Sequence, residues 1–358
     1  MNTKEFLKAI ADANGPSGQE YEASAVIASG FSPWVDQVET DRMGNVYAVK
    51  EPTEKKDKKD KVPTILIDAH VDEIALMIKD ITEEGFLYVH QVGGFDPRTL
   101  LAQEVVIHGR QQVIGIIAAK SNAIQSPEET KKVLPLGELM IDTGLPADQV
   151  KALIRVGDRA TIRREATDLL GDWVTGKALD DRAGIAAMFA CAQELKKLRH
   201  EARVIFQSSV QEETTGLGAR VGVHKWQPDF AIAIDVGFGM TPEVSVEDGI
   251  EMGKGPAISL GSNTHRKLYQ MLLDTAKTYQ LPNQLELTPT GSGTNGQPMQ
   301  IVRQGVPVAV ISLPLRYMHT SVETIRMADV EATGQLLARM IADLTWEKRE
   351  ELLCYETN

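Results

Sequence analysis

Cysteine is scarce in this chain of 358 residues, which contains only Cys191 and Cys354. The first lies in an apolar helical pattern and the second is near the C-terminus, so the pair makes no disulfide framework of the kind found in small secreted domains. The N-terminal stretch MNTKEFLKAIADANG also lacks the apolar core of a signal peptide. We therefore expect a protein of a reducing compartment, the cytoplasm.

Long apolar runs and an excess of basic charge are missing too. No apolar run approaches the ~20 residues that a membrane-spanning helix needs. Lysine and arginine total 38 against 50 aspartates and glutamates, which gives a formal net charge of −12. A nucleic-acid-binding groove would need a basic face. We therefore expect neither a membrane nor a nucleic acid among the partners.

The remaining composition is that of a globular protein, with 42% hydrophobic residues and a length that suggests about two domains. Between residues 73 and 164, short β-branched segments recur, glycine punctuates them, and helix signals are few. These segments are LYVHQVGG, EVVIHG, QVIGIIAA and RATIRR. The pattern predicts a small β domain at 73–164. It would be inserted into a second domain formed by residues 1–72 and 165–358.

Outside residues 73–164, apolar strand patterns alternate with amphipathic helix patterns. The helix patterns are strongest at 180–198, 265–281 and 328–344. This alternation predicts an α/β fold with a largely parallel sheet. Ligands of such sheets bind beyond the carboxyl ends of the strands. The predicted strands are TILIDAH (64–70), RVIFQSSV (203–210), DFAIAID (229–235) and VPVAVISLP (306–314).

Side chains of the metal-ligating types follow several of these apolar segments. Imidazole and carboxylate ligands suit zinc, cobalt and manganese, and two metals that share a bridging carboxylate would need about this set. Each residue alone has an ordinary explanation, such as a helix N-cap for either aspartate of the pair 180–181. Their coincidence favours a metal centre. The residues are His70, Asp180 with Asp181, Glu212 with Glu213, Asp235 and His319.

One residue of the pair Glu212–Glu213, and Asp72, could assist such a centre without binding the metal. At a turn after a strand, one residue of the pair Glu212–Glu213 can bind a metal while the other stands over a bridging water. A carboxylate in that position is a general base. Asp72 follows His70 by two residues, and a carboxylate at that spacing can hold the second ring nitrogen of a ligating histidine.

The segments DAHVDE, KALDDRAG, QEETTGLGAR, AIDVG and RYMH resemble the M42 family of co-catalytic metallo-aminopeptidases, which includes glutamyl aminopeptidase and the tetrahedral aminopeptidases. The resemblance covers nearly the whole chain in the same order. It implies a phosphorylase/hydrolase-like α/β catalytic domain with a central mixed sheet. It also implies an inserted, PDZ-like β-barrel that mediates dimerisation, and dimers that assemble into a tetrahedral dodecamer.

The same resemblance implies an aminopeptidase with two divalent ions per subunit, zinc or cobalt with manganese as an alternative. Its substrates would be short peptides with a free N-terminus. Asn295 is a departure, since many relatives have Gly-Thr-Asp-Ala where this chain has GTNG. The resemblance implies that Asp180 bridges the two ions, that His70 and Asp235 bind different ions, and that Glu213 and His319 are the remaining ligands. It also implies a general base for Glu212 and supporting carboxylates for Asp72 and Asp181.

Other functions remain open at this point. A carboxypeptidase or an N-acyl amino acid deacylase could use a related scaffold and the same ligands. A glycosidase would need two separated carboxyl groups, which adjacent Glu212 and Glu213 do not provide, and it would leave the histidines unexplained. A non-catalytic peptide-binding protein would have lost a ligand or Glu212, and none is lost. The preferred N-terminal residue, the native metal and the oligomer size do not follow from the sequence.

Overall fold

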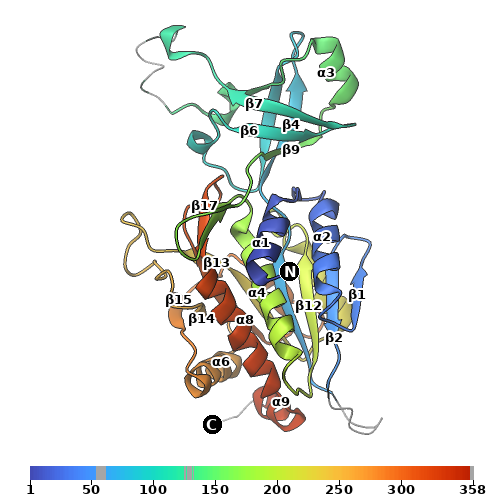
Figure 1. Ribbon diagram of the computed structural model, residues 1–358, viewed down its shortest axis with the longest axis vertical. Helices are drawn as coiled ribbons and strands as arrows, with labels where there is room; N and C mark the ends of the chain where they lie inside the picture. The colour runs from blue at the N-terminus through green and yellow to red at the C-terminus, as the bar shows by residue number, and fades with distance from the viewer. Residues whose placement is uncertain (54–61, 125, 127–130, 132, 355–358) are drawn as a thin grey trace.

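The computed structural model describes residues 1–358 apart from 54–61, 125, 127–130, 132 and 355–358. A small β-barrel is stacked on a larger α/β body, so the molecule is elongated along one axis (Figure 1). The chain leaves the α/β body after β3 (Thr64–His70) and returns to it before α4 (Leu179–Leu195). The barrel is therefore continuous in sequence, and the α/β body is formed by the segments on both sides of it.

Six strands close the barrel in the order β4-β5-β8-β7-β6-β9. The strands predicted at 87–94, 104–109, 112–119 and 159–164 are confirmed, whereas α3 was not expected. Inward side chains such as Leu76, Ile107 and Ile141 form an apolar cluster of their own. Alternation along β7 leaves Ile114 and Ile116 about half exposed on the outer face. The elements are β4 (Ala75–Ile81), β5 (Leu87–Val92), β6 (Glu104–His108), β7 (Gln112–Ala118), β8 (Met140–Asp142), β9 (Arg159–Ile162), α3 (Ala147–Leu153) and the 3₁₀ turns η1 (Pro97–Thr99), η2 (Asn122–Ile124) and η4 (Leu136–Glu138).

An eight-stranded sheet forms the centre of the α/β body. Its four middle strands are parallel to one another, as are β14 and β15, whereas β1–β2, β2–β12 and β16–β14 pair antiparallel. The sheet is therefore mixed, with four parallel pairings among seven. Parallel neighbours need a long crossover, whereas β1 and β2 are joined only by residues 41–45 and form a hairpin. In spatial order the strands are β1 (Gln37–Thr40), β2 (Val46–Lys50), β12 (Arg203–Ser209), β3, β13 (Phe230–Phe238), β16 (Val308–Leu315), β14 (Ala257–Gly261) and β15 (Gln284–Thr288).

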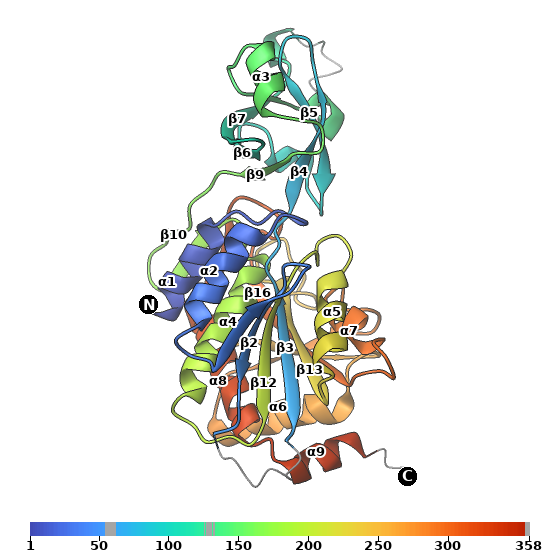
Figure 2. The ribbon, with the colours of Figure 1, turned by 90° about the vertical axis from the view of Figure 1, so that its right-hand side faces the viewer.

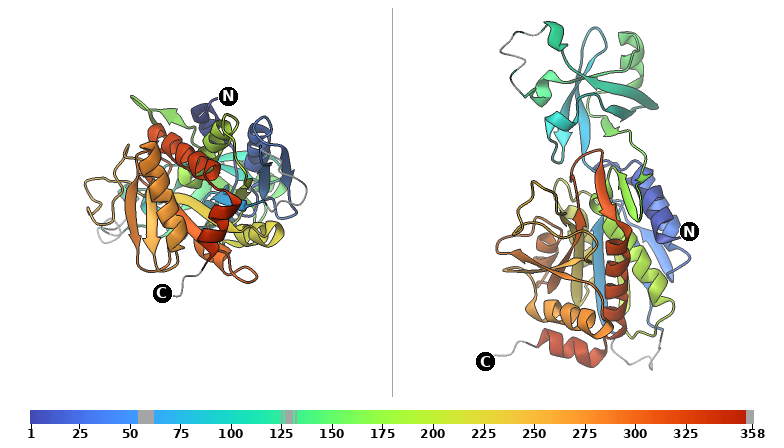
Figure 3. Two further views of the ribbon diagram at one scale, coloured as in Figure 1. Left: turned by 90° about the horizontal axis from the view of Figure 1, so that it is seen from below. Right: turned by 60° about the vertical axis from the view of Figure 1, so that its left-hand side comes forward.

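Helices cover both faces of this sheet (Figure 2). One face carries α1 (Thr3–Asp12), α2 (Tyr21–Phe31), α4, α6 (Arg266–Tyr279) and α8 (Met327–Ala342). The other carries α5 (Leu217–Trp226) and α7 (Gly296–Gln300). At the end far from the barrel, α6 lies beside α9 (Trp346–Leu353) (Figure 3). None of the helices in the described part of the chain has the length and apolar character needed to cross a bilayer.

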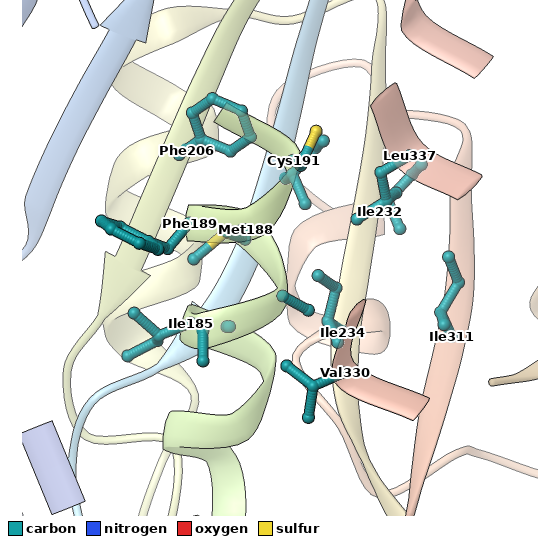
Figure 4. Packing of buried hydrophobic residues seen from close by; sticks show 14 of the residues in the cluster. Ile185, Met188, Phe189, Cys191, Phe206, Ile232, Ile234, Ile311, Val330 and Leu337 are labelled. Atoms are coloured by element: carbon teal, nitrogen blue, oxygen red, sulfur yellow. The ribbon is translucent and has the colours of Figure 1, made fainter. Parts of the chain in front are cut away.

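The main core lies where α4 and α8 pack side by side on one face of the sheet. Nearly all residues of α4 are apolar or small, and most of them are buried. Ile185 and Met188 of α4 belong to the same apolar cluster as Ile232 of β13 and Leu337 of α8 (Figure 4). A side-chain carbon at Gly334 of α8 would lie only 2.6 Å from that of Ala190. The absence of a side chain at this position allows α8 to pack closely against the C-terminal half of α4.

A buried ion cluster lies where the chain crosses from β3 into the barrel. Glu73 accepts hydrogen bonds from Lys177 Nζ at 2.9 Å to both carboxylate oxygens, from Arg182 Nη2 at 3.3 Å and from Gly15 N at 2.9 Å. Burial alone would raise the pKa of Glu73, but Lys177 and Arg182 hold it below its ordinary value of 4.5. Arg182 also donates to the main-chain oxygen of Val71 at 3.1 Å, which links the cluster to the end of β3.

Replacing Glu73 by glutamine is expected to lower the free energy of unfolding by about 3–5 kcal/mol, because Lys177 and Arg182 are then buried without a counter-charge. The folded pKa of Glu73 is depressed, so its ionised form stabilises the fold above pH 4.5, and that stabilisation is lost as the pH falls. Urea unfolding at neutral pH should therefore show a larger difference from the wild type than unfolding in acid.

Glu194→Gln is the matched control for this substitution. Glu194 pairs with Lys197 at 2.7 Å on the surface, where such pairs contribute less than about 1 kcal/mol. Equal losses in the two variants would contradict the assigned role of the buried cluster.

Candidate metal centre

The residues predicted to bind metal lie at the end of the α/β body that faces the barrel. His70 is the last residue of β3, as expected. Asp235 does not end its strand, because β13 continues to Phe238 and keeps pairing with β16 as far as Leu315. His319 lies beyond the end of β16 with a backbone φ of 61°. The central parallel strands thus bring together residues that are up to 249 positions apart in the sequence.

Asp180 reaches the same place by a route that the sequence did not indicate. The strand before it, β11 (Trp173–Gly176), belongs to a separate three-stranded sheet with β10 (Thr167–Asp168) and β17 (Glu323–Arg326). The apolar segment before Asp180 does form a strand, but that strand lies outside the main sheet and ends at Gly176, four residues before Asp180. Asp180 instead lies at the N-terminal end of α4, in a non-helical conformation, and the peptide bond to Asp181 is cis.

Five side chains form two groups that share Asp180. His70, Asp180 and Asp235 make one group, and Asp180, Glu213 and His319 make the other, with the potential ligand atoms of each group within 4.8 Å of one another. Asp180 Oδ1 is 3.1 Å from His70 Nε2, and its Oδ2 is 3.3 Å from His319 Nε2. His319 Nε2 is also 3.3 Å from Glu213 Oε1. The two oxygens of one carboxylate therefore face two different groups of ligand atoms.

Charge in this cluster fits divalent cations. Burial raises the pKa of Asp235 well above its ordinary value and also raises that of Glu213. Burial opposes protonation of His319, but Asp180 and Glu213 raise its pKa to about 11. Such a concentration of carboxylates needs nearby positive charge, and imidazole nitrogens with carboxylate oxygens are the donor set of zinc, cobalt and manganese sites. The residues present therefore fit a metal centre, with Asp180 able to contact both ions.

Glu212 lies beside the five potential ligands and belongs to neither group. Its Oε2 is 3.9 Å from His70 Nε2. Burial raises the pKa of Glu212 to about 7, a shift that His70 opposes and that Asp72 and Glu213 reinforce. A carboxylate with a pKa near neutrality can both accept and return a proton at that pH. The geometry therefore separates the adjacent glutamates, with Glu213 among the ligands and Glu212 next to them.

Asp72 holds the main chain of this acidic pair. Its Oδ1 accepts a hydrogen bond from Glu212 N at 2.9 Å, and its Oδ2 accepts one from Glu213 N at 3.2 Å. His70 Nδ1 lies 3.0 Å from the main-chain oxygen of Asp72 and 3.6 Å from Oδ1. The ring nitrogen is thus closer to the carbonyl than to the carboxylate. One residue orients both a histidine and the turn that carries the two glutamates.

Asp181 belongs to neither ligand group. Its Oδ1 accepts a hydrogen bond from Gly184 N at 3.0 Å, which caps the regular part of α4. Burial, reinforced by Asp235, raises its pKa well above the ordinary value. The ordinary N-cap explanation thus describes Asp181, whereas its neighbour Asp180 faces the two histidines.

Glu323 of β17 is part of this site and was not predicted. Its Oε2 accepts a hydrogen bond from Asp180 N at 3.1 Å, and its Oε1 accepts one from His319 N at 2.9 Å. Burial raises its pKa to about 8. Glu323 therefore fixes the main chain of two potential ligands at once. The only signal in the sequence is a single acid in the short segment SVETIR, in which β-branched residues predominate.

A second unpredicted group lies behind His70. Asp68 Oδ2 accepts hydrogen bonds from Asn295 Nδ2 at 2.8 Å and from Ser209 Oγ at 3.1 Å, and burial raises the pKa of Asp68 to about 7. An acid at position 295 would place a second carboxylate beside Asp68. The amide of Asn295 provides a hydrogen-bond donor instead, so this departure is matched by the structure around it.

Two cavities meet at Glu213. One of about 420 Å³ lies between the ligand cluster and residues that include Phe238, Glu286 and Thr294. The other, of about 630 Å³, lies between the α/β body and the barrel, and Ser17 and Arg159 are among its lining residues. A molecule placed at the ligand groups therefore has room on both sides of them.

Comparisons with known proteins agree with this arrangement. The family model described as M42 glutamyl aminopeptidase matches residues 44–336. The lysyl aminopeptidase of Pyrococcus furiosus is 32% identical over 347 residues, which are 95% of this chain and 97% of that one. The structure of an aminopeptidase from the archaeon Desulfurococcus kamchatkensis has a TM-score of 0.89, 31% identity and 99% coverage of both chains.

A third similar protein adds information on assembly. The TET1 peptidase of Pyrococcus horikoshii, which can assemble into a tetrahedron or a large octahedral shell, has a TM-score of 0.82 and 27% identity. The match covers 96% of this chain and 100% of that one.

Proposed function

The chain belongs to the M42 glutamyl aminopeptidase family, and we propose that it removes N-terminal residues from short peptides with two divalent metal ions and Glu212 as general base. Membership makes it an aminopeptidase, hence a peptide hydrolase of a metal-dependent family. The observation that carries the proposal is the position of Asp180, whose two carboxylate oxygens face different histidines. A bridging carboxylate is what a two-metal site requires.

In this proposal each of the two groups would hold one ion, with Asp180 shared between them. His70 and Asp235 were expected to bind different ions, but they lie in one group and would hold the same ion, whereas Glu213 and His319 would hold the other. Zinc or cobalt suits these ligands, and manganese is the alternative. Glu323, which binds the main chain at Asp180 and His319, keeps the bridging ligand and one histidine in register. When bound, the ions would polarise the scissile carbonyl and lower the pKa of the attacking water.

Glu212 then handles the protons of the reaction. Its carboxylate accepts a proton from the attacking water and later gives that proton to the nitrogen of the leaving peptide. Asp72 keeps the turn in place through the main-chain nitrogens of Glu212 and Glu213. The surplus of carboxylates at the site favours a substrate amino group, which carries positive charge when protonated.

We also propose that residues 73–164 form a PDZ-like dimerisation domain and that 1–72 with 165–358 form the catalytic domain. The half-exposed Ile114 and Ile116 on β7 would support contact between barrels. Dimers would assemble into a tetrahedral dodecamer, a proposal that the shells formed by the Pyrococcus horikoshii peptidase support. The scarcity of cysteine supports a cytoplasmic location.

Hydrolysis of matched free and N-acetylated peptides tests the proposed function. After chelation we expect no cleavage, and after addition of Zn²⁺, Co²⁺ or Mn²⁺ we expect cleavage of the free peptides alone. The ions are needed to lower the pKa of the attacking water and to polarise the scissile carbonyl. Acetylation converts the free amino group that the proposed enzyme requires into an amide. The measurement is the amount of free N-terminal amino acid released, determined by chromatography. Cleavage of the acetylated set would instead favour a deacylase or a carboxypeptidase.

A further inference from the structure

Glu286 projects from β15 toward the cavity next to the metal ligands. Side chains alternate along a strand, and here the alternation is the reverse of what stability alone would favour. Leu285 and Leu287 point to solvent and are 56% and 68% exposed, whereas the acid between them is directed inward. Neither the ligand groups nor the proposed proton transfers use this carboxylate.

The carboxylate of Glu286 is held in place and remains accessible. Its Oε2 accepts a hydrogen bond from Ser312 Oγ at 2.7 Å, and Ser312 lies opposite Asp235 in the β13–β16 pairing. Gly237 stands between the acid and the cavity, and a side-chain carbon there would lie 3.3 Å from Glu286 Oε1. Because position 237 has no side chain, this oxygen stays open to the cavity.

The separation between this carboxylate and the metal ligands matches the length of a basic side chain. Asp235 and Gly237 are two residues apart on one face of β13, which corresponds to about 7 Å along the strand. A lysine side chain extends about 6 Å from Cα to its ammonium group. A residue whose amino end lies at the ligand groups could therefore place a terminal charge beside Glu286.

Away from His319 and the other residues of the ligand groups, the described lining of this cavity carries no positive charge that could pair with an acidic side chain. Among its lining residues in the described part of the chain, none is lysine or arginine. Arg316 is near in sequence to His319, but its Nε donates to the main-chain oxygen of Met240 at 2.8 Å and its guanidinium lies 5.0 Å from the centre of the Trp173 ring. Burial raises the pKa of Glu286, so a cation beside it would stabilise its ionised form.

We propose that Glu286 selects substrates whose N-terminal residue is lysine or arginine. The inference rests on the proposed aminopeptidase function and names its substrate class. The ammonium or guanidinium group would pair with Glu286, and Phe238, which also lines the cavity, would contact the methylene groups of the side chain. Glu286 is thus a specificity-determining residue that contacts the substrate away from the scissile bond.

The test compares lysyl, arginyl, leucyl and glutamyl 4-nitroanilides with the metal-loaded enzyme and its Glu286→Gln variant. For the wild type we expect kcat/KM to be highest with lysine or arginine and lowest with glutamate. In Glu286→Gln we expect kcat/KM for the two basic substrates to fall by about 10- to 100-fold, the range of one hydrogen-bonded ion pair. The value for leucine should change by less than about 2-fold, which also shows that the variant is folded.

Glu331→Gln is the matched control, since it removes the same charge from an exposed position on α8. It should leave all four values unchanged. A wild-type preference for leucine or glutamate, or equal losses for leucine and lysine in Glu286→Gln, would overturn the role of Glu286 and leave the aminopeptidase function standing. No cleavage of any substrate by the wild type would overturn the proposed function and this inference with it.

Discussion

Replacement of Glu212 by glutamine is expected to lower kcat by about 10²–10⁴ while metal content stays unchanged. The amide has nearly the same shape as the carboxylate but cannot accept the proton of the attacking water. Glu212 lies outside both ligand groups, so its loss removes no metal ligand. Steady-state hydrolysis of a free peptide and elemental analysis of the same preparation provide the two measurements.

Glu83→Gln is a suitable control, because Glu83 lies exposed in the turn between β4 and β5. It should retain wild-type kcat and metal content. Near-normal turnover in Glu212→Gln would refute the assignment of the general base, and loss of metal in that variant would move Glu212 into the ligand set.

Replacement of Asp180 by alanine is expected to weaken the binding of both metal ions by more than about 100-fold. Residues that only orient a ligand already contribute about 10- to 100-fold to metal affinity, so loss of a shared ligand should cost more. Asp180 is the one residue common to the two groups in the described part of the chain. Titration with Zn²⁺ or Co²⁺, with bound metal counted per subunit, measures the effect.

His70→Ala and His319→Ala are the informative comparisons for Asp180→Ala. Each removes a ligand from only one group, so each should weaken the binding of one ion and leave the binding of the second unchanged. Loss of a single ion in Asp180→Ala, with the second retained at wild-type affinity, would show that Asp180 does not bridge.

Much of this site could be predicted, because its residues stand at the ends of short sequence patterns that are typical of strands and helices. TILIDAH was expected to form a strand that ends at His70, and it does so. The helix pattern after Asp180 and the turn at Glu212 and Glu213 likewise depend on neighbouring residues. Apolar alternation and its interruption by acids are visible without knowledge of the fold. Such signals place candidate ligands at the ends of elements.

The remaining features depend on contacts between distant segments, which no local pattern records. Glu323 lies 143 residues from Asp180 in sequence, and only the packing of β17 beside α4 brings its carboxylate to that main chain. Asn295 and Asp68 are 227 residues apart. β11 pairs with β17 and not with the main sheet. Strand propensity predicts that a segment forms a strand, but it does not predict which strand it pairs with.

The hydrogen bonds from Glu212 and Glu213 to Asp72 tie the end of β3 to the turn after β12. In the parallel pairing of these strands, His70 lies opposite Ser209. A slip of one residue would turn every side chain of β3 to the other face of the sheet and move His70 away from Asp180. A chain with that error would lack a complete ligand group, and bound metal stabilises only the fold that binds it. Metal binding would then stabilise chains with correctly paired strands over chains with a shifted register.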